Sequence, residues 1–194
     1  MKSAVYLASN SPRRSELLTQ IGVSFTQVKA SIEEKINPGE TAVRYVERLA
    51  LQKAQAGFVN SPKDRPVLGA DTIVVIDQHI LEKPRNESHA REMMQLLSGR
   101  KHQVFTAVAL VDNLRSQHVL VKTDVCFKVL SDNEIGDYWL TGEPLDKAGG
   151  YGIQGVGGKF VTAIEGSYSA VVGLPLYETD QLIKAFLQAP QNAR

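Results

Sequence analysis

Apolar residues recur along the chain with two periods, one typical of strands and one typical of helices. The period of two is clearest over 118–130, which predicts a strand with one shared face: Val119, Val121, Thr123, Val125, Phe127 and Val129. The helical period is clearest from Thr41 to about Ala56, with a predicted inward stripe of Val43, Val46, Leu49, Ala50 and Ala54. The pattern predicts further strands over 4–8, 25–30, 67–77, 80–84 and 102–111, and further helices over 12–21, 87–98, 132–140 and 175–187.

Capping residues mark several of the predicted helix ends. Ser11 and Asn86 are suitable N-caps, and Ser131 with Glu134 matches a capping box. Gly22 and Gly99 each follow a helical segment and are predicted to end it.

The most informative stretch is 67–77, where β-branched apolar residues predict a buried strand. Gly69-Ala70 and the polar pair Asp71-Thr72 interrupt its middle. A carboxylate among Val and Ile must be hydrogen-bonded, paired or bound to a cation, because burying it bare is costly. The small residues leave room for something to approach the backbone. The alternative is a loop between two short strands, in which Asp71 caps a turn.

Basic residues stand at two unusual positions. Arg13 and Arg14 fall in the first turn of a helix that follows a strand, where the helix dipole prefers acids. A phosphate bound at that helix N-terminus accounts for them better than a solvated face does. Lys53 falls inside the inward stripe of its helix, where it either snorkels to water or, as we favour, lines an anionic cleft.

Six glycines gather within 149–158. The segment 150–155 formally satisfies G-x-G-x-x-G, but no strand precedes it and no helix follows, so a dinucleotide fold is not indicated. We predict a backbone-lined loop near a ligand, with a flexible surface loop as the alternative.

Composition narrows the class of protein. The chain has 194 residues, 43% of them hydrophobic and 22% charged, which is typical of a globular domain or one domain with two lobes. The formal net charge of +1 gives no reason to expect binding to nucleic acid or to a membrane surface. Cys126 has no disulfide partner and is expected to be buried in a strand. We expect a cytoplasmic protein, with a frayed tail at 190–194.

Two charged sets lie near element ends or face inward. The basic set is Arg13, Arg14, Lys53 and Lys83, and the acidic set is Glu33, Glu34, Asp71 and Glu82. Cations bind phosphate oxygens and carboxylates hold a hard metal ion, so the mixture favours an enzyme acting on a nucleotide or phosphate ester.

Five sequence blocks resemble the signature of the Maf family. They are Ser9-Asn10-Ser11-Pro12-Arg13-Arg14, Gly69-Ala70-Asp71-Thr72, Glu82-Lys83-Pro84, Asp146-Lys147-Ala148-Gly149 with Tyr151-Gly152-Ile153-Gln154-Gly155, and Val172-Gly173-Leu174-Pro175. They run in order over nearly the whole chain. The resemblance implies one α/β domain over 1–194, with an elongated mixed sheet, flanking helices and two lobes around a central cleft, similar to the inosine-triphosphate pyrophosphatases. It also implies a homodimer that uses a divalent cation, Mg²⁺ or Mn²⁺, to convert a nucleoside triphosphate to monophosphate and pyrophosphate.

The family's functional positions carry over to residues of this chain. Asp71 falls on the proposed proton acceptor, and Arg13, Thr72 and Gln154 fall on the specificity positions, where they match the branch acting on dTTP and UTP. The Thr72 hydroxyl is expected beside Asp71. We expect Ser9, Arg14, Lys53 and Lys83 to bind phosphates, and Glu34 with Asp71 to bind the metal.

The resemblance also sets the alternatives. Removal of non-standard pyrimidine nucleotides is a further expectation. The other enzymatic possibility is the branch acting on 7-methylguanosine triphosphate. The non-enzymatic possibility is a regulator of septum formation that binds nucleotide without cleaving it.

Overall fold

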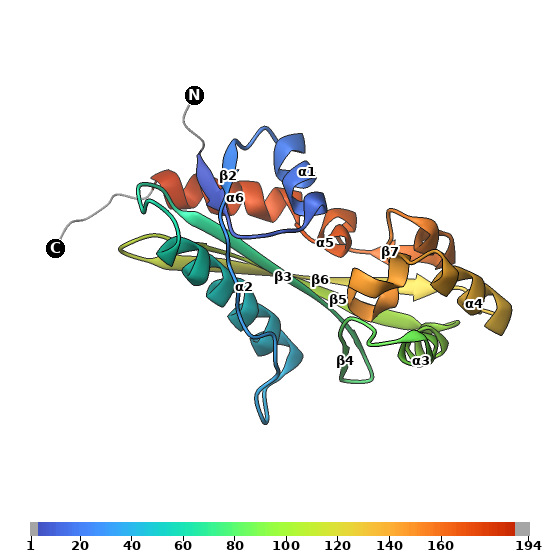
Figure 1. Cartoon of the computed structure of the whole chain (residues 1–194). Helices are drawn as coiled ribbons and strands as arrows, with labels where there is room; N and C mark the ends of the chain where they lie inside the picture. The colour runs from blue at the N-terminus through green and yellow to red at the C-terminus, as the bar shows by residue number, and fades with distance from the viewer. Residues whose placement is uncertain (1–3, 189–194) are drawn as a thin grey trace. The chain divides into compact units, whose positions relative to one another are not determined.

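The computed structural model describes residues 4–188, so the tail predicted at 190–194 lies outside the described residues. The strands are β1 (Val5–Leu7), β2 (Phe25–Gln27), β3 (Val67–Ile76), β4 (His79–Leu81), β5 (Lys101–Val111), β6 (Ser116–Phe127) and β7 (Val161–Glu165) (Figure 1). The helices are α1 (Pro12–Gln20), α2 (Ala42–Val59), α3 (Glu87–Leu97), α4 (Asp132–Leu140), α5 (Tyr168–Val172) and α6 (Leu176–Gln188). Three 3₁₀ turns, Glu143–Asp146, Ala148–Gly150 and Val156–Phe160, lie between α4 and β7.

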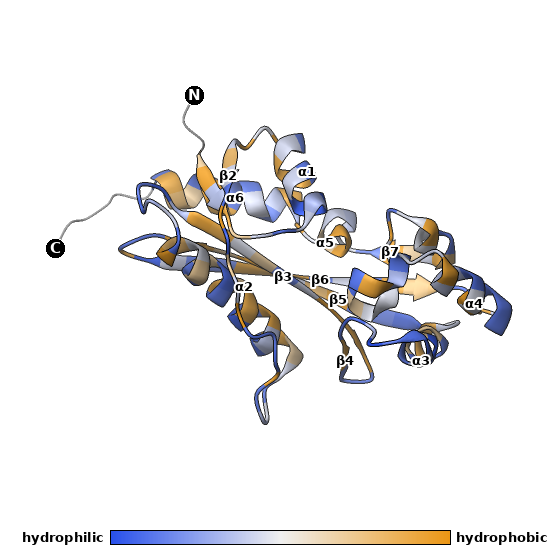
Figure 2. Cartoon of the chain, viewed as in Figure 1, coloured by the Kyte–Doolittle hydropathy of each residue, from blue (hydrophilic) through white to orange (hydrophobic). Residues whose placement is uncertain are grey.

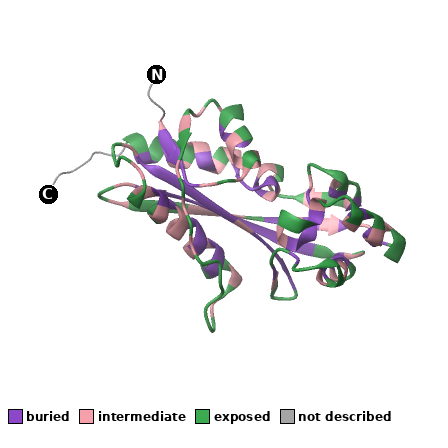
Figure 3. Cartoon of the chain, viewed as in Figure 1, coloured by how far each residue is buried: buried purple, intermediate pink, exposed green. Residues whose placement is uncertain are grey.

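The described strands form one mixed sheet. Their order is β2-β1-β3-β5-β6-β7, with β4 paired to β3 outside that path. Strand β1 pairs in parallel with β2 and β3, whereas β4 is antiparallel to β3 and β7 is antiparallel to β6. Figures 2 and 3 show that the central strands are both hydrophobic and buried. The predicted α/β fold with a mixed sheet and flanking helices is therefore confirmed.

The chain divides into two compact units. The first comprises residues up to Asp71, 106–121 and those from Gly173 on, and the second comprises 72–105 and 122–172. A single domain over 1–194 stays a prediction.

Strand β3 corrects the interpretation of the central stretch. It runs without interruption from Val67 to Ile76, and Asp71 is part of it. The predicted interruption by 69–72 is therefore wrong, and so is the alternative in which Asp71 caps a turn. Almost every residue of β3 is buried, which is the environment of a strand covered on both faces.

In the first unit, small residues let helix α2 lie close to the sheet. A Cβ added at Gly57 would lie 2.6 Å from the Ala8 Cβ of the segment after β1. Tyr45, Val46 and Leu49 of α2 are buried, whereas Val43, predicted to face inward, is exposed. Val43 lies in the first turn of α2, and the buried residues of that helix begin at Tyr45.

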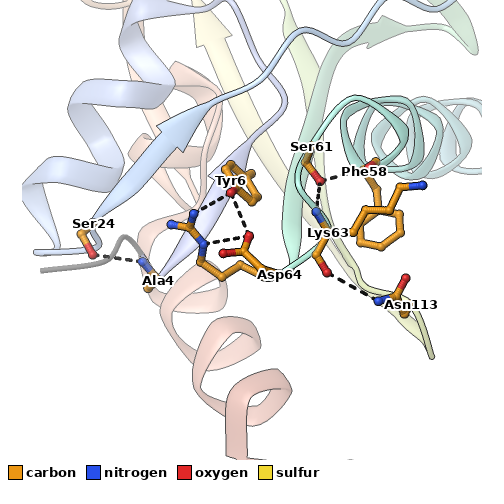
Figure 4. Close-up of polar contacts among 9 residues, drawn as sticks. Ala4, Tyr6, Ser24, Phe58, Ser61, Lys63, Asp64 and Asn113 are labelled. Carbon is orange, nitrogen blue, oxygen red and sulfur yellow. Dashed lines mark hydrogen bonds and ion pairs between the residues drawn. The ribbon is translucent and has the colours of Figure 1, made fainter.

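A polar cluster ties β1 to the segment that precedes β3. The hydroxyl of Tyr6 donates to Asp64 Oδ1 at 2.8 Å, and Arg65 donates to the same hydroxyl (Figure 4). The Arg65 guanidinium also lies over the Tyr6 ring, 4.3 Å from its centroid. These contacts satisfy the polar end of a tyrosine that is only 3% exposed.

In the second unit, the predicted inward face of α3 is confirmed. Its buried residues are Ala90, Met93, Met94 and Leu97, and Asn86 caps the helix by accepting from the His89 N–H at 2.9 Å. The capping box of Ser131 and Glu134 at α4 is also confirmed.

Ser11 is the N-cap residue of α1, as predicted, but its side chain makes no capping hydrogen bond within the described structure. Two predictions of detail are wrong. Val129 is 78% exposed, because β6 ends at Phe127 and the strand alternation does not continue beyond it. Cys126 is only half-buried. Within residues 4–188, no helix is both long and apolar enough to cross a membrane.

Candidate active site

An ion-pair cluster surrounds the buried side chain of Asp71 in the first unit, and its third member, Glu34, is exposed. Oδ1 of Asp71 accepts a hydrogen bond from Lys53 Nζ at 2.6 Å, and the same ammonium lies 2.7 Å from Oε1 of Glu34. The side chain of Asp71 is 8% exposed and that of Lys53 is 14% exposed. Lys53 therefore turns inward to carboxylates, and the snorkelling alternative is wrong.

A close approach between α2 and β3 creates this pairing. A Cβ added at Gly69 would lie 2.4 Å from the backbone nitrogen of Ala54 and 2.5 Å from the carbonyl oxygen of Ala50. Gly69 and Asp71 are two residues apart in a strand, so they share a face. The space predicted beside Gly69 is thus filled by the backbone of α2, which places Lys53 against Asp71.

Burial and neighbouring charges shift the pKa values of the cluster. Burial raises the pKa of Asp71, and the charges of Lys53 and Arg14 offset only part of that effect. Burial lowers the pKa of Arg14, while Asp71 acts in the opposite direction. The guanidinium nevertheless stays protonated at physiological pH. A carboxylate with a raised pKa is a stronger base, as proton acceptance at neutral pH requires.

Arg14 joins the first and last of the sequence blocks. Its Nε donates to the carbonyl oxygen of Gly173 at 2.8 Å, and its Nη1 donates to Ser9 Oγ at 3.4 Å. Ser9 Oγ also accepts from the backbone N–H of Ser11 at 3.1 Å. The start of α1 is therefore tied to the segment before α6, and the guanidinium is fixed near Asp71 and Glu34. Arg13 lies beside it in the same first turn.

Two residues that the sequence did not single out hold the loop that carries Glu34. Arg48 of α2 donates to both carboxylate oxygens of Glu40 at 2.6 Å and to the backbone carbonyl of Lys35 at 2.9 Å. These bonds lower the pKa of Glu40 to about 2, so the pair is charged at neutral pH. The sequence could not predict the pairing of Glu40 with Arg48, because no helix or strand period relates a loop residue to a helix residue eight positions later.

The glycine-rich loop belongs to the second unit and is braced by two side chains. Glu143 accepts from the backbone N–H groups of Val156 at 2.7 Å and Gly157 at 3.0 Å. Tyr138 donates to Glu143 at 2.7 Å and accepts from the Gly152 N–H at 3.0 Å. The alternative of a flexible loop is therefore not supported. The glycine density was the one available signal for Glu143, but we interpreted it as room for a ligand, whereas Glu143 and Tyr138 occupy the space beside Gly152, Gly155 and Gly157.

The other predicted residues of the second unit occupy separate places in it. Lys83 is exposed just after β4, and Gln154 is exposed in the glycine-rich loop. Thr72 follows Asp71 in β3, and successive side chains of a strand point to opposite faces. The role of Thr72 in substrate specificity stays a prediction.

Comparison with known proteins identifies the family. The profile of the family described as "Maf-like protein" matches residues 4–186. The chain belongs to the Maf family. A dTTP/UTP pyrophosphatase of Pseudoalteromonas atlantica is 61% identical over 180 residues, which are 91% of this chain and 94% of the relative. The proteins of that name from Yersinia pestis and Escherichia coli O157:H7 are 57% and 56% identical, over 99% and 95% of this chain and 97% and 93% of their own lengths.

The donor set of this Maf protein suits a cation shared with a triphosphate. Among residues 4–188, no group of three or more His, Cys, Asp and Glu side chains lies close enough to enclose a metal ion. Mg²⁺, however, is commonly bound by one or two carboxylates together with substrate phosphates and water. Glu34 and Asp71, which share Lys53, supply such a pair of carboxylates.

The roles assigned to individual residues of this Maf protein stay predictions. The structure does bring together five of the predicted residues through the contacts described above: Ser9, Arg14, Glu34, Lys53 and Asp71.

Proposed function

We propose that this Maf protein hydrolyses dTTP and UTP to the monophosphate and pyrophosphate with the help of a divalent cation. The observation that carries the proposal is the buried Asp71 carboxylate, paired with Lys53 in a cluster that also contains Glu34. The names of relatives at 56–61% identity over nearly the whole chain support the substrate class. Non-standard pyrimidine triphosphates are further proposed substrates.

The proposed reaction is the attack of water on the α-phosphorus. Asp71 accepts a proton from that water, and the water oxygen forms a bond to the α-phosphorus. The bond between that phosphorus and the α–β bridging oxygen breaks. Pyrophosphate leaves with the bridging oxygen. Glu34 and Asp71 would hold a magnesium or manganese ion, which would supply positive charge to the phosphate oxygens.

The basic residues of the cluster bind the negative charge of the triphosphate. Lys53 has three N–H donors, of which Asp71 and Glu34 engage two, so the third can bind a phosphate oxygen. Arg14 offers a planar guanidinium whose orientation is fixed by Ser9 and the Gly173 carbonyl. We propose that Lys83 contributes a further cation to the same phosphates.

Hydrogen bonds to the base set the proposed preference. Thymine and uracil present an N3–H donor between two carbonyl acceptors, and the Gln154 amide can accept from the donor and donate to a carbonyl. Cytosine has an unprotonated N3, and purines present a different edge. A mismatched base would cover the Gln154 amide in the bound complex without pairing its donor and acceptor, which disfavours that base. Arg13 and Thr72 are proposed as the other specificity residues.

A pyrophosphate-release assay over dTTP, UTP, CTP, ATP, GTP and 7-methylguanosine triphosphate, with Mg²⁺ or Mn²⁺, tests the proposal. We expect dTTP and UTP to be the preferred substrates and Asp71→Asn to lower turnover by about 10²–10⁴-fold. Near wild-type turnover of Asp71→Asn would overturn its role as the base. Recovery of that variant at high metal concentration would assign Asp71 chiefly to metal binding.

The same panel separates the alternatives. Preference for 7-methylguanosine triphosphate would place the protein in the other branch of the family. Tight nucleotide binding without pyrophosphate release would favour a regulatory binding protein. Gln154→Glu removes the amide donor and adds a charge, so we expect it to lower the rate with dTTP.

A further inference from the structure

We infer that Glu143 and Tyr138 are positioning residues for recognition of the pyrimidine base, because they fix the backbone on both sides of Gln154. This inference rests on the proposed function. Neither side chain is required to touch the substrate.

Tyr138 and Glu143 bind the backbone on both sides of Gln154. On the N-terminal side of Gln154, the Gly152 N–H donates to the Tyr138 hydroxyl at 3.0 Å. On the C-terminal side, the N–H groups of Val156 and Gly157 donate to Glu143 Oε2 at 2.7 Å and Oε1 at 3.0 Å. The Tyr138 hydroxyl donates to Glu143 Oε1 at 2.7 Å, so the two side chains are bonded to each other. Four hydrogen bonds thus restrain a short turn in which the side chain of Gln154 is exposed.

The glycines of the loop make room for the side chains of Glu143 and Tyr138, which we call the brace. A Cβ added at Gly155 would lie 2.1 Å from Glu143 Oε2, and one at Gly152 would lie 2.9 Å from Glu143 Oε1. A Cβ at Gly157 would lie 2.6 Å from the Tyr138 hydroxyl. Three glycines around Gln154 are therefore explained by the approach of Glu143 and Tyr138 to the backbone.

The ring of Tyr138 is held in place by burial and packing. Tyr138 is 1% exposed and packs edge-on against Phe160, with ring centroids 5.0 Å apart and an interplanar angle of 88°. Burial tends to raise the pKa of Glu143, but hydrogen bonds from Tyr138 and the backbone of Gly157 and Val156 outweigh it, so the pKa is lowered. Glu143 is therefore a carboxylate at neutral pH and a strong acceptor for those N–H groups.

A fixed backbone at Gln154 affects discrimination more than overall binding. A held amide presents one donor and acceptor arrangement, which suits thymine and uracil. In a mobile loop, the amide can rotate or shift to satisfy cytosine, so the penalty for the mismatched base falls. Loss of the brace is thus expected to relax selectivity.

The test compares kcat/KM for dTTP and dCTP in Tyr138→Phe and Glu143→Gln. Tyr138→Phe removes the bridging hydroxyl and keeps the packed ring, and Glu143→Gln replaces an acceptor oxygen with a donor that opposes a backbone N–H. We expect the dTTP-to-dCTP ratio to fall by about tenfold in each variant, the result of losing a discrimination near 1.4 kcal/mol. Amide hydrogen exchange at Gly152, Val156 and Gly157 should become faster in both.

Two controls separate positioning from general destabilisation. Glu134→Ala removes the side chain that completes the capping box of α4 and leaves the loop contacts of Glu143 and Tyr138 in place, so it should lower stability and leave the ratio unchanged. In a Gln154→Ala background, Tyr138→Phe should change the ratio no further, because the braced side chain is already gone.

The outcomes distinguish this inference from the proposed function. A selective wild-type enzyme whose ratio is unchanged in both brace variants would overturn the inference alone. Additive effects of Tyr138→Phe and Gln154→Ala would also overturn it. A wild-type protein that releases pyrophosphate from no nucleoside triphosphate would overturn the proposed function instead.

Discussion

The ammonium of Lys53 lies 2.6 Å from Oδ1 of Asp71, and both side chains are largely removed from water. The pair links a helix to a strand in the first compact unit. Each buried charge is stabilised by the other, so replacing either residue should affect stability as well as chemistry.

Lys53→Met should lower both turnover and stability. It leaves Asp71 as a buried carboxylate without its lysine, and breaking a buried pair on one side costs roughly 3–5 kcal/mol. We expect turnover to fall by at least about 10²-fold, since Lys53 also binds phosphate. Thermal unfolding and pyrophosphate release measure the two effects.

The double variant Lys53→Met with Asp71→Asn is the matched control. Both partners are then neutral, so stability should largely recover while turnover stays low. A double variant no more stable than Lys53→Met would show that the charge of Asp71 is not the source of the lost stability.

Gly69→Ala should displace α2 from β3. The added Cβ would lie 2.4 Å from the Ala54 nitrogen, and backbone atoms cannot move aside as a flexible side chain can. Overpacking of this kind costs typically about 1–3 kcal/mol. Activity should fall with stability, because the same helix carries Lys53.

Gly136→Ala offers a matched comparison inside α4. There the nearest atom to an added Cβ is Arg91 Nη2 at 3.3 Å, the end of a flexible side chain. Alanine in a helix interior is favoured over glycine by up to about 1 kcal/mol. We expect unchanged activity and equal or higher stability, and a loss comparable with that of Gly69→Ala would contradict the packing argument.

Arg48→Met should weaken the hold on the loop that carries Glu34. The two bonds to Glu40 and the bond to the Lys35 carbonyl would be lost together. Because small misplacements near reacting groups are costly, we expect turnover to fall by about 10- to 10²-fold. The apparent affinity for Mg²⁺, measured by titration of activity, should fall as well.

Two variants control for the Arg48 effect. Arg44→Met removes an exposed arginine from the same helix and should leave turnover unchanged. Arg48→Lys keeps the charge but not the planar fork, so only part of the activity should return. Full activity of Arg48→Met would refute a role for this residue in placing Glu34.

His102 should make stability depend on pH in the acid range. Its Nε2 lies 2.8 Å from the Tyr151 hydroxyl, and burial lowers the pKa of His102 to about 4 from its ordinary 6.5. The unfolded chain therefore takes up a proton first as the pH falls. Stability should decline between pH 6.5 and about 4, by on the order of 3 kcal/mol.

Urea unfolding of wild type, His102→Gln and His118→Gln at several pH values tests this. The decline should be much smaller in His102→Gln, because the titrating group is gone. His118 is exposed on β6, so its replacement should leave the decline unchanged. An equal decline in the His102 and His118 variants would contradict the prediction.

Short-range patterns of the sequence determined much of the fold. The inward face of α3, the caps at Asn86 and Ser131, and the inward position of Lys53 could be read because helix periodicity and capping depend on residues a few positions apart. The apolar neighbours of Asp71 allowed either its burial in a strand or a turn that it caps, and the structure shows the burial. The sequence blocks indicated the family.

Only the tertiary structure decided where these pieces meet. The interruption expected in β3 was wrong, because the close packing of α2 at Gly69 and the Lys53 partner let a carboxylate stay inside an unbroken strand. The contacts of Arg14 with Gly173 and of Arg48 with Glu40 follow no period. The glycines around Gln154 predicted a ligand near the backbone, whereas the fold placed the side chain of Glu143 there, since contacts across the chain depend on how whole elements pack.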